Sequence, residues 1–210
     1  MTEPQTEKQT GRVEAFSDGV FAIAITLLVL ELKVPPIEGH TSSAELLAAL
    51  LNQWPSYAAY LTSFLTILIM WVSHHQMFIV IRRIDTTFMY INGLLLLLIT
   101  TVPFPTALLA EYLRFPGSTL ACAVYSGLFV GIAIGYNLLW AYARRRGLVE
   151  VVLQPGIIGS ISRSYYIGPL LYLIAFALSF VNVYLSMAVC GALALFYALL
   201  SYESKIAHAP

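Results

Sequence analysis

Charged residues are scarce in this sequence of 210 residues. Lys and Arg together number 11, Asp and Glu also number 11, and the four types make up 10% of the chain, against about 25% in soluble domains. So few charges cannot cover the surface of a soluble enzyme of this size. The formal net charge is zero, which gives no reason to expect nucleic acid as a partner.

Cysteine and the familiar catalytic motifs are also missing or nearly so. Cys122 and Cys190 both lie in apolar runs, and neither belongs to a CxxC pair, so the sequence offers no disulfide framework and no zinc motif. There is no P-loop filter of the TVGYG type, no GxxxxGK[ST] loop, no HExxH motif and no Ser/His/Asp spacing. We therefore expect no enzyme, no metal site and no cofactor.

Apolar residues are in excess, at 59% of the chain against roughly 45–50% in globular proteins. A helix that crosses a bilayer needs about 20 apolar residues, and the chain has room for six. We predict an all-α membrane protein with six transmembrane helices in a single domain, residues 1–210. The predicted spans are 14–34, 56–80, 87–110, 118–143, 164–181 and 184–202. The last two form one long apolar run, which we divide at Asn182.

Local signals set several boundaries. The pair Pro35-Pro36 ends the first helix, and Pro103 and Pro105 break or kink the third near its end. Between the first two spans, Ser43–Leu51 predicts a short amphipathic helix with a serine cap. The segment 144–164 is expected to lie at the membrane surface.

The distribution of basic residues predicts the orientation. With the N-terminus inside, nine of the 11 Lys and Arg residues fall on the inner side, and only Lys33 and Arg114 fall outside. The nine are Lys8, Arg12, Arg82, Arg83, Arg144, Arg145, Arg146, Arg163 and Lys205. The positive-inside rule then places both termini in the cytoplasm.

The first span carries an unusual set of polar residues. At about 100° per residue, one stripe of the helix contains Arg12, Gly19, Ile23, Thr26, Leu27 and Leu30. Asp18 lies on the opposite face and must be buried against protein, because a charge facing lipid is costly. The alternative is that the aliphatic stripe packs into a bundle and Asp18 pairs locally.

Two later spans contribute further polar side chains. Trp71, His74 and His75 lie near the inner end of the second span, and Asn92 lies one turn into the third. Adjacent histidines point about 100° apart on a helix, which does not suit a shared metal. We expect one histidine to form a charge-assisted hydrogen bond with Asp18.

Together these residues resemble the transmembrane protein 175 family of potassium channels. The resemblance is carried by Arg12-x-x-x-Phe16-Ser17-Asp18, which matches the RxxxFSD signature of that family, and it continues with Trp71-x-x-His74-His75. Asn92 and Pro103-Phe104-Pro105 also match the family pattern. The likeness covers nearly the whole chain.

Because a single six-span unit is similar to the bacterial members of the family, the resemblance implies a homotetramer in a bacterial-type plasma membrane. The first helix of each chain would then line a central pore. The implied pore positions are Ile23, Leu27 and Leu30, with Thr26 as a polar layer, and they agree with the stripe above. The remaining signature residues belong to a packing network: Arg12, Phe16, Ser17, Asp18, Trp71, His74, His75 and Asn92. An aliphatic constriction would then conduct potassium, and less selectively other monovalent cations, when it wets.

A secondary transporter for protons or cations is the alternative, and it would use Asp18 and the pair His74/His75. Such a protein typically has an inverted repeat and substrate-sized polar groups near the midplane. The sequence shows neither. A metal or cofactor protein built on the two histidines would need further ligands at membrane depth, whereas His40 and His208 lie in a loop and near the C-terminus.

Overall fold

The structure, a computed structural model, describes residues 3–35, 42–149 and 155–206, and the side chains of residues 10–35, 42–149 and 165–197. Within these residues the chain is helical almost throughout. The helices are α1 (Glu3–Leu27), a 3₁₀ turn η1 (Leu28–Glu31), α2 (Ser43–Asn52), α3 (Trp54–Val80), α4 (Thr86–Thr100), α5 (Pro103–Tyr112), α6 (Ser118–Arg145), α7 (Pro155–Ser179) and α8 (Val183–Ile206).

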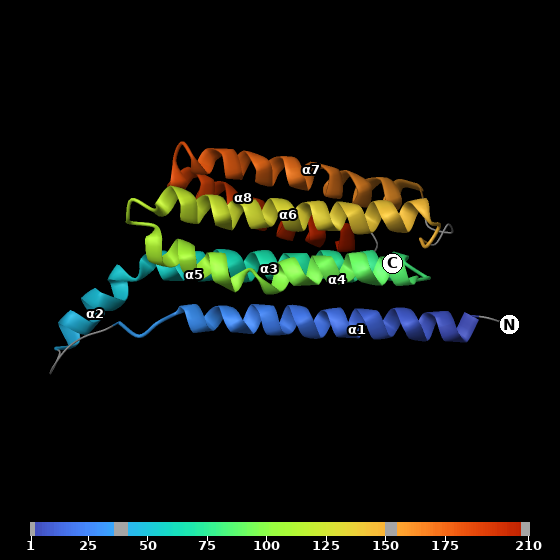
Figure 1. Cartoon of the computed structure of the whole chain (residues 1–210), viewed down its shortest axis with the longest axis horizontal. Helices are drawn as coiled ribbons and strands as arrows, with labels where there is room; N and C mark the ends of the chain where they lie inside the picture. Colours follow the sequence, from blue (N-terminus) through green and yellow to red (C-terminus); the bar gives the residue numbers. More distant parts are fainter. Residues whose placement is uncertain (1–2, 36–41, 150–154, 207–210) are drawn as a thin grey trace.

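The long helices lie side by side in layers (Figure 1). Helix α1 forms one outer layer and contacts mainly α3 and α4, while α5 continues the line of α4. On the other side of α3, α4 and α5 lie α6, α7 and α8, with α6 and α7 in the most extensive contact. The two largest fully buried side chains, Trp140 and Tyr125, belong to α6, and they are followed by one phenylalanine each from α1, α4 and α6 (Phe21, Phe88 and Phe129). The core therefore lies around α6, and α1 is attached to its edge.

Helix boundaries follow from local chemistry. Ser42 and Glu45 form a reciprocal capping box at the start of α2, which confirms the short helix predicted there and its serine cap. The carboxylate of Asp85 accepts a hydrogen bond from the Phe88 amide at the start of α4. Pro103 begins α5 after a turn that follows α4, so the helix breaks where the prolines predicted it.

Among the described residues, four helical segments are long and apolar enough to cross a membrane. They are Thr10–Glu31, Trp54–Val80, Thr86–Tyr112 and Ser118–Arg145, and they correspond to the first four predicted spans. The fifth and sixth predictions differ: among residues with described side chains, they correspond to the shorter apolar segments Tyr165–Ser179 and Val183–Tyr197. Four of the six predicted spans therefore correspond to helical segments of full spanning length.

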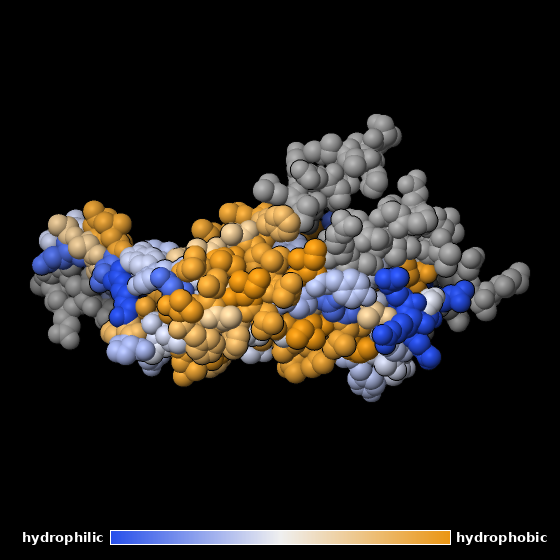
Figure 2. Space-filling model, turned by 90° about the horizontal axis from the view of Figure 1, so that it is seen from above, coloured by the Kyte–Doolittle hydropathy of each residue, from blue (hydrophilic) through white to orange (hydrophobic). Residues whose placement is uncertain are grey.

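The turn between α7 and α8 lies at residues 180–182. The Asn182 side-chain oxygen accepts a hydrogen bond from the Leu185 amide, 3.1 Å away, and so caps α8. Part of the predicted surface segment, residues 150–154, lies outside the described residues. Figure 2 shows that apolar residues occupy the middle of the visible face and that hydrophilic residues gather toward both ends, as in a membrane protein.

Candidate functional site

Helix α1 has one face buried against the rest of the chain. Ser17, Phe21, Ala24 and Leu28 are fully or almost fully buried, and their spacing of three or four residues places them on one side of the helix. This side faces α3 and α4, as the position of α1 in Figure 1 requires. These four residues thus mark the side of α1 that packs against the rest of the chain.

The opposite face of α1 is exposed, and it is the predicted stripe. Ile23 is 58% exposed, Leu27 41% and Leu30 68%, although all three are aliphatic and lie within a span. Leu28–Glu31 continues α1 as a 3₁₀ turn, and Leu30 stays exposed despite this change of pitch. In a single copy of the chain, this apolar stripe therefore has no protein covering it.

Thr26 lies on the same exposed face. Its hydroxyl lies 2.9 Å from each of two carbonyl oxygens of its own helix, those of Ala22 and Ile23. A hydroxyl has one hydrogen to donate and two lone pairs that can accept. Because the hydrogen points to the backbone, the lone pairs of Thr26 are left for a water molecule or a cation.

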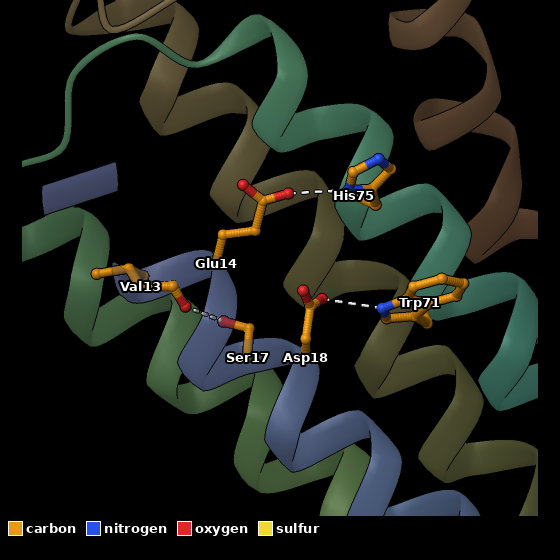
Figure 3. Close-up of polar contacts among 6 residues, drawn as sticks. All are labelled: Val13, Glu14, Ser17, Asp18, Trp71 and His75. Atoms are coloured by element: carbon orange, nitrogen blue, oxygen red, sulfur yellow. Dashed lines mark hydrogen bonds and ion pairs between the residues drawn. The ribbon is translucent and has the colours of Figure 1, made fainter. Parts of the chain in front are cut away.

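Asp18 is attached to α3 by a tryptophan rather than by a histidine. Trp71 Nε1 donates a hydrogen bond to Asp18 Oδ1 at 2.9 Å (Figure 3). We expected Asp18 to meet a histidine, and this prediction is wrong. The indole N–H, a donor with no acceptor role, lies one helical turn before His75 on α3 and satisfies the carboxylate.

Glu14, rather than Asp18, is the carboxylate that contacts a histidine. His75 Nδ1 lies 2.8 Å from Glu14 Oε1, and the two side chains point toward each other in Figure 3. The His75 side chain is 49% exposed and that of Glu14 is 25% exposed, so the pair lies at the edge of the bundle. The sequence had not led us to predict a partner for Glu14. The signal was its position four residues before Asp18, which places both carboxylates on the same face of α1.

These two contacts establish the register between α1 and α3. Glu14 faces His75 and Asp18 faces Trp71, so a step of four residues forward on α1 matches a step of four back on α3. That relation is what two antiparallel helices with a common contact face require. The rings of Trp71 and His75 are also stacked, with centroids 6.2 Å apart.

A third, buried contact joins α1, α3 and α4. Asn92 Nδ2 donates to Ser17 Oγ at 3.0 Å, and Ser17 Oγ donates to the Val13 carbonyl at 2.8 Å. The remaining acceptor, Asn92 Oδ1, lies 2.9 Å from His74 Nε2. Because an amide oxygen can only accept, His74 must carry its proton on Nε2. One asparagine thus binds a side chain from each of the other two helices.

His74 is fully buried, and its ring is packed between aromatic neighbours. The ring centroids of His74 and Phe78 are 4.5 Å apart, and those of His74 and Phe21 are 5.3 Å apart. Among the described residues, His74 Nδ1 has no hydrogen-bond partner. The ring is therefore held by one hydrogen bond and by packing.

Two signature residues do not join this network. Arg12 is exposed, and Phe16 is 67% exposed. Both lie on the side of α1 that carries Ile23, so the structure separates them from Ser17 and Asp18. The described residues also contain no group of three or more His, Cys, Asp or Glu side chains that could hold a metal ion.

Comparison with known proteins finds similarity to potassium channels. The family model described as endosomal/lysosomal potassium channel TMEM175 matches residues 12–103. A potassium channel of Chamaesiphon minutus is 52% identical over 96% of this chain and 99% of its own length. A potassium channel of Streptomyces collinus is 46% identical over 90% of this chain and 91% of its own.

A solved structure has the same fold. The crystal structure of a lysosomal potassium-selective channel TMEM175 homolog from Chamaesiphon minutus superposes with a TM-score of 0.81 at 52% sequence identity. The match covers 92% of this chain and 98% of the other. The likeness therefore extends over most of the chain.

Proposed function

This chain belongs to the TMEM175 family of potassium channels, a family of channels and not of enzymes, and on that premise we propose that it conducts potassium passively through a pore lined by α1. The pore is formed by four copies of the chain in a bacterial plasma membrane. Ile23, Leu27 and Leu30 form stacked rings along its axis, and Thr26 adds a polar layer. Potassium is the main permeant ion, and other monovalent cations pass less readily.

The exposed stripe on α1 is the observation that carries this proposal. Polar and apolar contacts hold the opposite face of α1 against α3 and α4, so the helix cannot turn to bury Ile23 or Leu30. Lipid could cover an aliphatic stripe, but this stripe also includes Arg12 and Thr26. A mixed face in this position is better suited to a pore that contains water over part of its length.

The position of α1 in the fold supports a closed ring of identical copies around a central pore. Because α1 forms an outer layer (Figure 1), copies arranged about a rotation axis can bring their α1 stripes together without displacing any other helix. A ring of identical head-to-tail contacts closes when the rotation per copy divides a full turn. Four copies would bring four equivalent Ile23 side chains to one level of the axis.

The chemistry of the stripe supports a constriction that works without a carbonyl cage. Rings of Ile23 and Leu27 exclude water when narrow and admit it when wide, so they gate by dewetting. The outward lone pairs of Thr26, whose hydrogen is donated to its own helix, can replace part of the hydration shell of a cation. We expect only a moderate preference for potassium over sodium.

The remaining fine details are proposed on similar grounds. We propose six crossings, because α7 and α8 are 25 and 24 residues long, and each residue adds about 1.5 Å to a helix against a hydrocarbon thickness of about 30 Å. Helix α1 begins and α8 ends at the same end of the bundle (Figure 1). With nine basic residues assigned to that side, we place both termini in the cytoplasm.

The transporter alternative finds no support in the geometry. Asp18 is bonded to Trp71, His74 to Asn92 and His75 to Glu14. Each of the three groups that would bind a substrate together therefore faces a different partner. A coupled transporter would need them to converge on one cavity.

The test is single-channel recording of the purified protein in planar bilayers, with potassium on one side and sodium on the other. Ile23→Ala should raise conductance and reduce the shift of the reversal potential, because four shorter side chains widen the ring. Val29→Ala is the matched control: Val29 is also aliphatic and 51% exposed, but it lies off the stripe. If the Ile23 variant keeps wild-type conductance and reversal potential, the pore does not run along α1.

A further inference from the structure

Two links at one end of the bundle are joined to each other. The link 81–85 connects α3 to α4, and the link 146–149 follows α6. Ile81 and Val149 form an antiparallel bridge, and the Arg82 amide donates to the Leu148 carbonyl at 3.1 Å. Both links lie at the end of the bundle where α1 begins (Figure 1).

A glycine turn makes this pairing possible. Gly147 has φ +66°, the left-handed conformation that ends many helices. The Leu148 amide donates to the Ala143 carbonyl and the Gly147 amide donates to the Arg144 carbonyl, the two bonds of a Schellman motif. The turn directs Leu148 and Val149 back toward the α3–α4 link.

Asp85 joins the two regions a second time. Its Oδ1 accepts from the Phe88 amide at 2.8 Å and its Oδ2 accepts from the Tyr142 hydroxyl of α6 at 2.8 Å. The Phe88 amide holds the pKa of the Asp85 carboxyl below its usual value, with smaller contributions from Tyr142 and the charge of Arg146. Both carboxylate oxygens thus have a partner in the fold, and the carboxylate stays ionised at neutral pH.

The result is a cluster of guanidinium groups from two separate parts of the chain. Arg83 on one link and Arg145 and Arg146 at the end of α6 are exposed. In the described part of these links, Asp85 is the acidic residue, and Glu150, next along the chain, lies outside the described residues. One ionised carboxylate leaves the cluster with a net positive charge.

We propose that these paired links form a binding site for the headgroups of anionic phospholipids. A planar guanidinium binds a phosphate group through two hydrogen bonds, and arginines just outside a span attract anionic lipids. The links end the spans Trp54–Val80 and Ser118–Arg145 and precede the span Thr86–Tyr112, so the cluster lies at the depth of the headgroups. The proposal rests on the membrane location of the chain and is independent of where its pore runs.

The experiment measures the unfolding temperature of the full chain in mixed micelles while the mole fraction of phosphatidylglycerol or phosphatidylcholine is raised. A ligand that binds only the folded state raises this temperature, and the shift grows with the logarithm of the ligand concentration once that concentration exceeds the dissociation constant. We expect phosphatidylglycerol to act at lower mole fraction than phosphatidylcholine. Each arginine near an anionic surface contributes roughly five-fold in affinity. The triple change Arg83→Gln, Arg145→Gln and Arg146→Gln should therefore lower the apparent affinity for phosphatidylglycerol by roughly a hundred-fold.

Matched variants separate a built site from simple charge. The double change Lys33→Gln and Arg114→Gln removes positive charge at the opposite end of the bundle and should leave the effect of phosphatidylglycerol unchanged. Tyr142→Phe keeps every arginine but removes one bond between the paired regions, so it should weaken the effect by a smaller factor than the triple change.

Inorganic phosphate at the same phosphate concentration should give no shift, because it lacks the membrane that concentrates the headgroups. Two results would overturn the proposal. One is an equal response to phosphatidylglycerol and phosphatidylcholine in the wild-type chain, and the other is an equal loss in the control double variant. A shift produced by free phosphate alone would also reject the lipid assignment.

Discussion

The two faces of α1 have similar amino acids and opposite surroundings. One face carries Phe21, Ala24 and Leu28, all buried, and the other carries Ile23, Leu27 and Leu30, all exposed. Both faces are largely apolar, so hydropathy alone does not distinguish them. The difference comes from the polar residues of the N-terminal half, Glu14, Ser17 and Asp18, which bind partners on α3 and α4.

This contrast shows how the orientation of a helix is specified inside a membrane. Apolar contacts give little direction, because lipid tails are as apolar as leucine side chains. Hydrogen bonds have direction, and three of them are grouped within about one turn of α1. The N-terminal half of α1 is therefore held in register by hydrogen bonds, and the C-terminal half follows it through apolar packing.

The largest expected effect compares one residue from each face. Phe21→Ala should lower the free energy of unfolding by about 3–5 kcal/mol, because it leaves a cavity in a fully packed site. Leu30→Ala should change it by less than about 0.5 kcal/mol and should alter conductance instead. Denaturant titration in detergent measures the first effect, and bilayer recording measures the second. Equal destabilisation by both changes would mean that the two faces do not differ as described.

The next effect concerns the buried asparagine. Asn92→Ala removes the partner of both Ser17 and His74, and a buried polar group left without a partner costs about 1–3 kcal/mol. We expect an unfolding temperature well below that of the wild type and a lower yield of assembled protein. Tyr90→Phe is the control, because Tyr90 is on the same helix but 75% exposed, and it should behave as wild type.

Asp18 should show a smaller and graded effect. Asp18→Ala removes the acceptor of the Trp71 indole. Because this contact is only partly buried, water can replace part of it, and we expect a loss of about 0.5–1.5 kcal/mol, the net contribution of a typical hydrogen bond. Asp18→Asn keeps an acceptor oxygen and should retain part of that contribution, although with a lower yield of intact tetramer than the wild type. Combining Asp18→Ala with Trp71→Phe in a double-mutant cycle measures the coupling. Normal assembly of Asp18→Asn with altered ion selectivity would instead place Asp18 in the pore.

The smallest effect is expected at the edge of the bundle. Glu14 and His75 are both partly exposed, and ion pairs in contact with solvent contribute about 0–1 kcal/mol. His75→Gln should therefore change the unfolding temperature little, and any change should shrink as salt is added, because salt screens exposed charges. A loss as large as that of Asn92→Ala would show that this pair, rather than the buried one, holds α1.

Much of the candidate site was predictable from residue spacing. The stripe that contains Ile23 and Leu30, and the placing of Asp18 on the opposite side, follow from helical periodicity. The partner of Asp18 did not follow, because the choice between Trp71 and His75 depends on how far α3 is shifted along α1. If α3 were shifted by one helical turn along α1, His75 would take the position of Trp71 beside Asp18. No local signal in either helix specifies how far α3 is shifted.

The fifth and sixth spans show another limit of prediction from sequence. Four apolar runs have clear polar or proline boundaries, and the described part of the chain contains four helical segments long and apolar enough to cross a membrane. The run 164–202 is marked near its middle by Asn182, and in the structure the side chain of Asn182 caps α8. The lengths of the two helices on either side depend on packing against α6 and α3.

The amino-acid sequence specifies what each segment can do alone: which runs can lie in a membrane, where prolines end a helix, and which residues share a face. These properties are local, because hydropathy, backbone dihedral limits and helical period act over a few residues. The tertiary structure decides which segments meet. It brings Asn92 between Ser17 and His74 and joins Ile81 to Val149, while it leaves Arg12 and Phe16 exposed. Such contacts join residues far apart in the chain, so they depend on the packing of the whole bundle and cannot be read from any one segment.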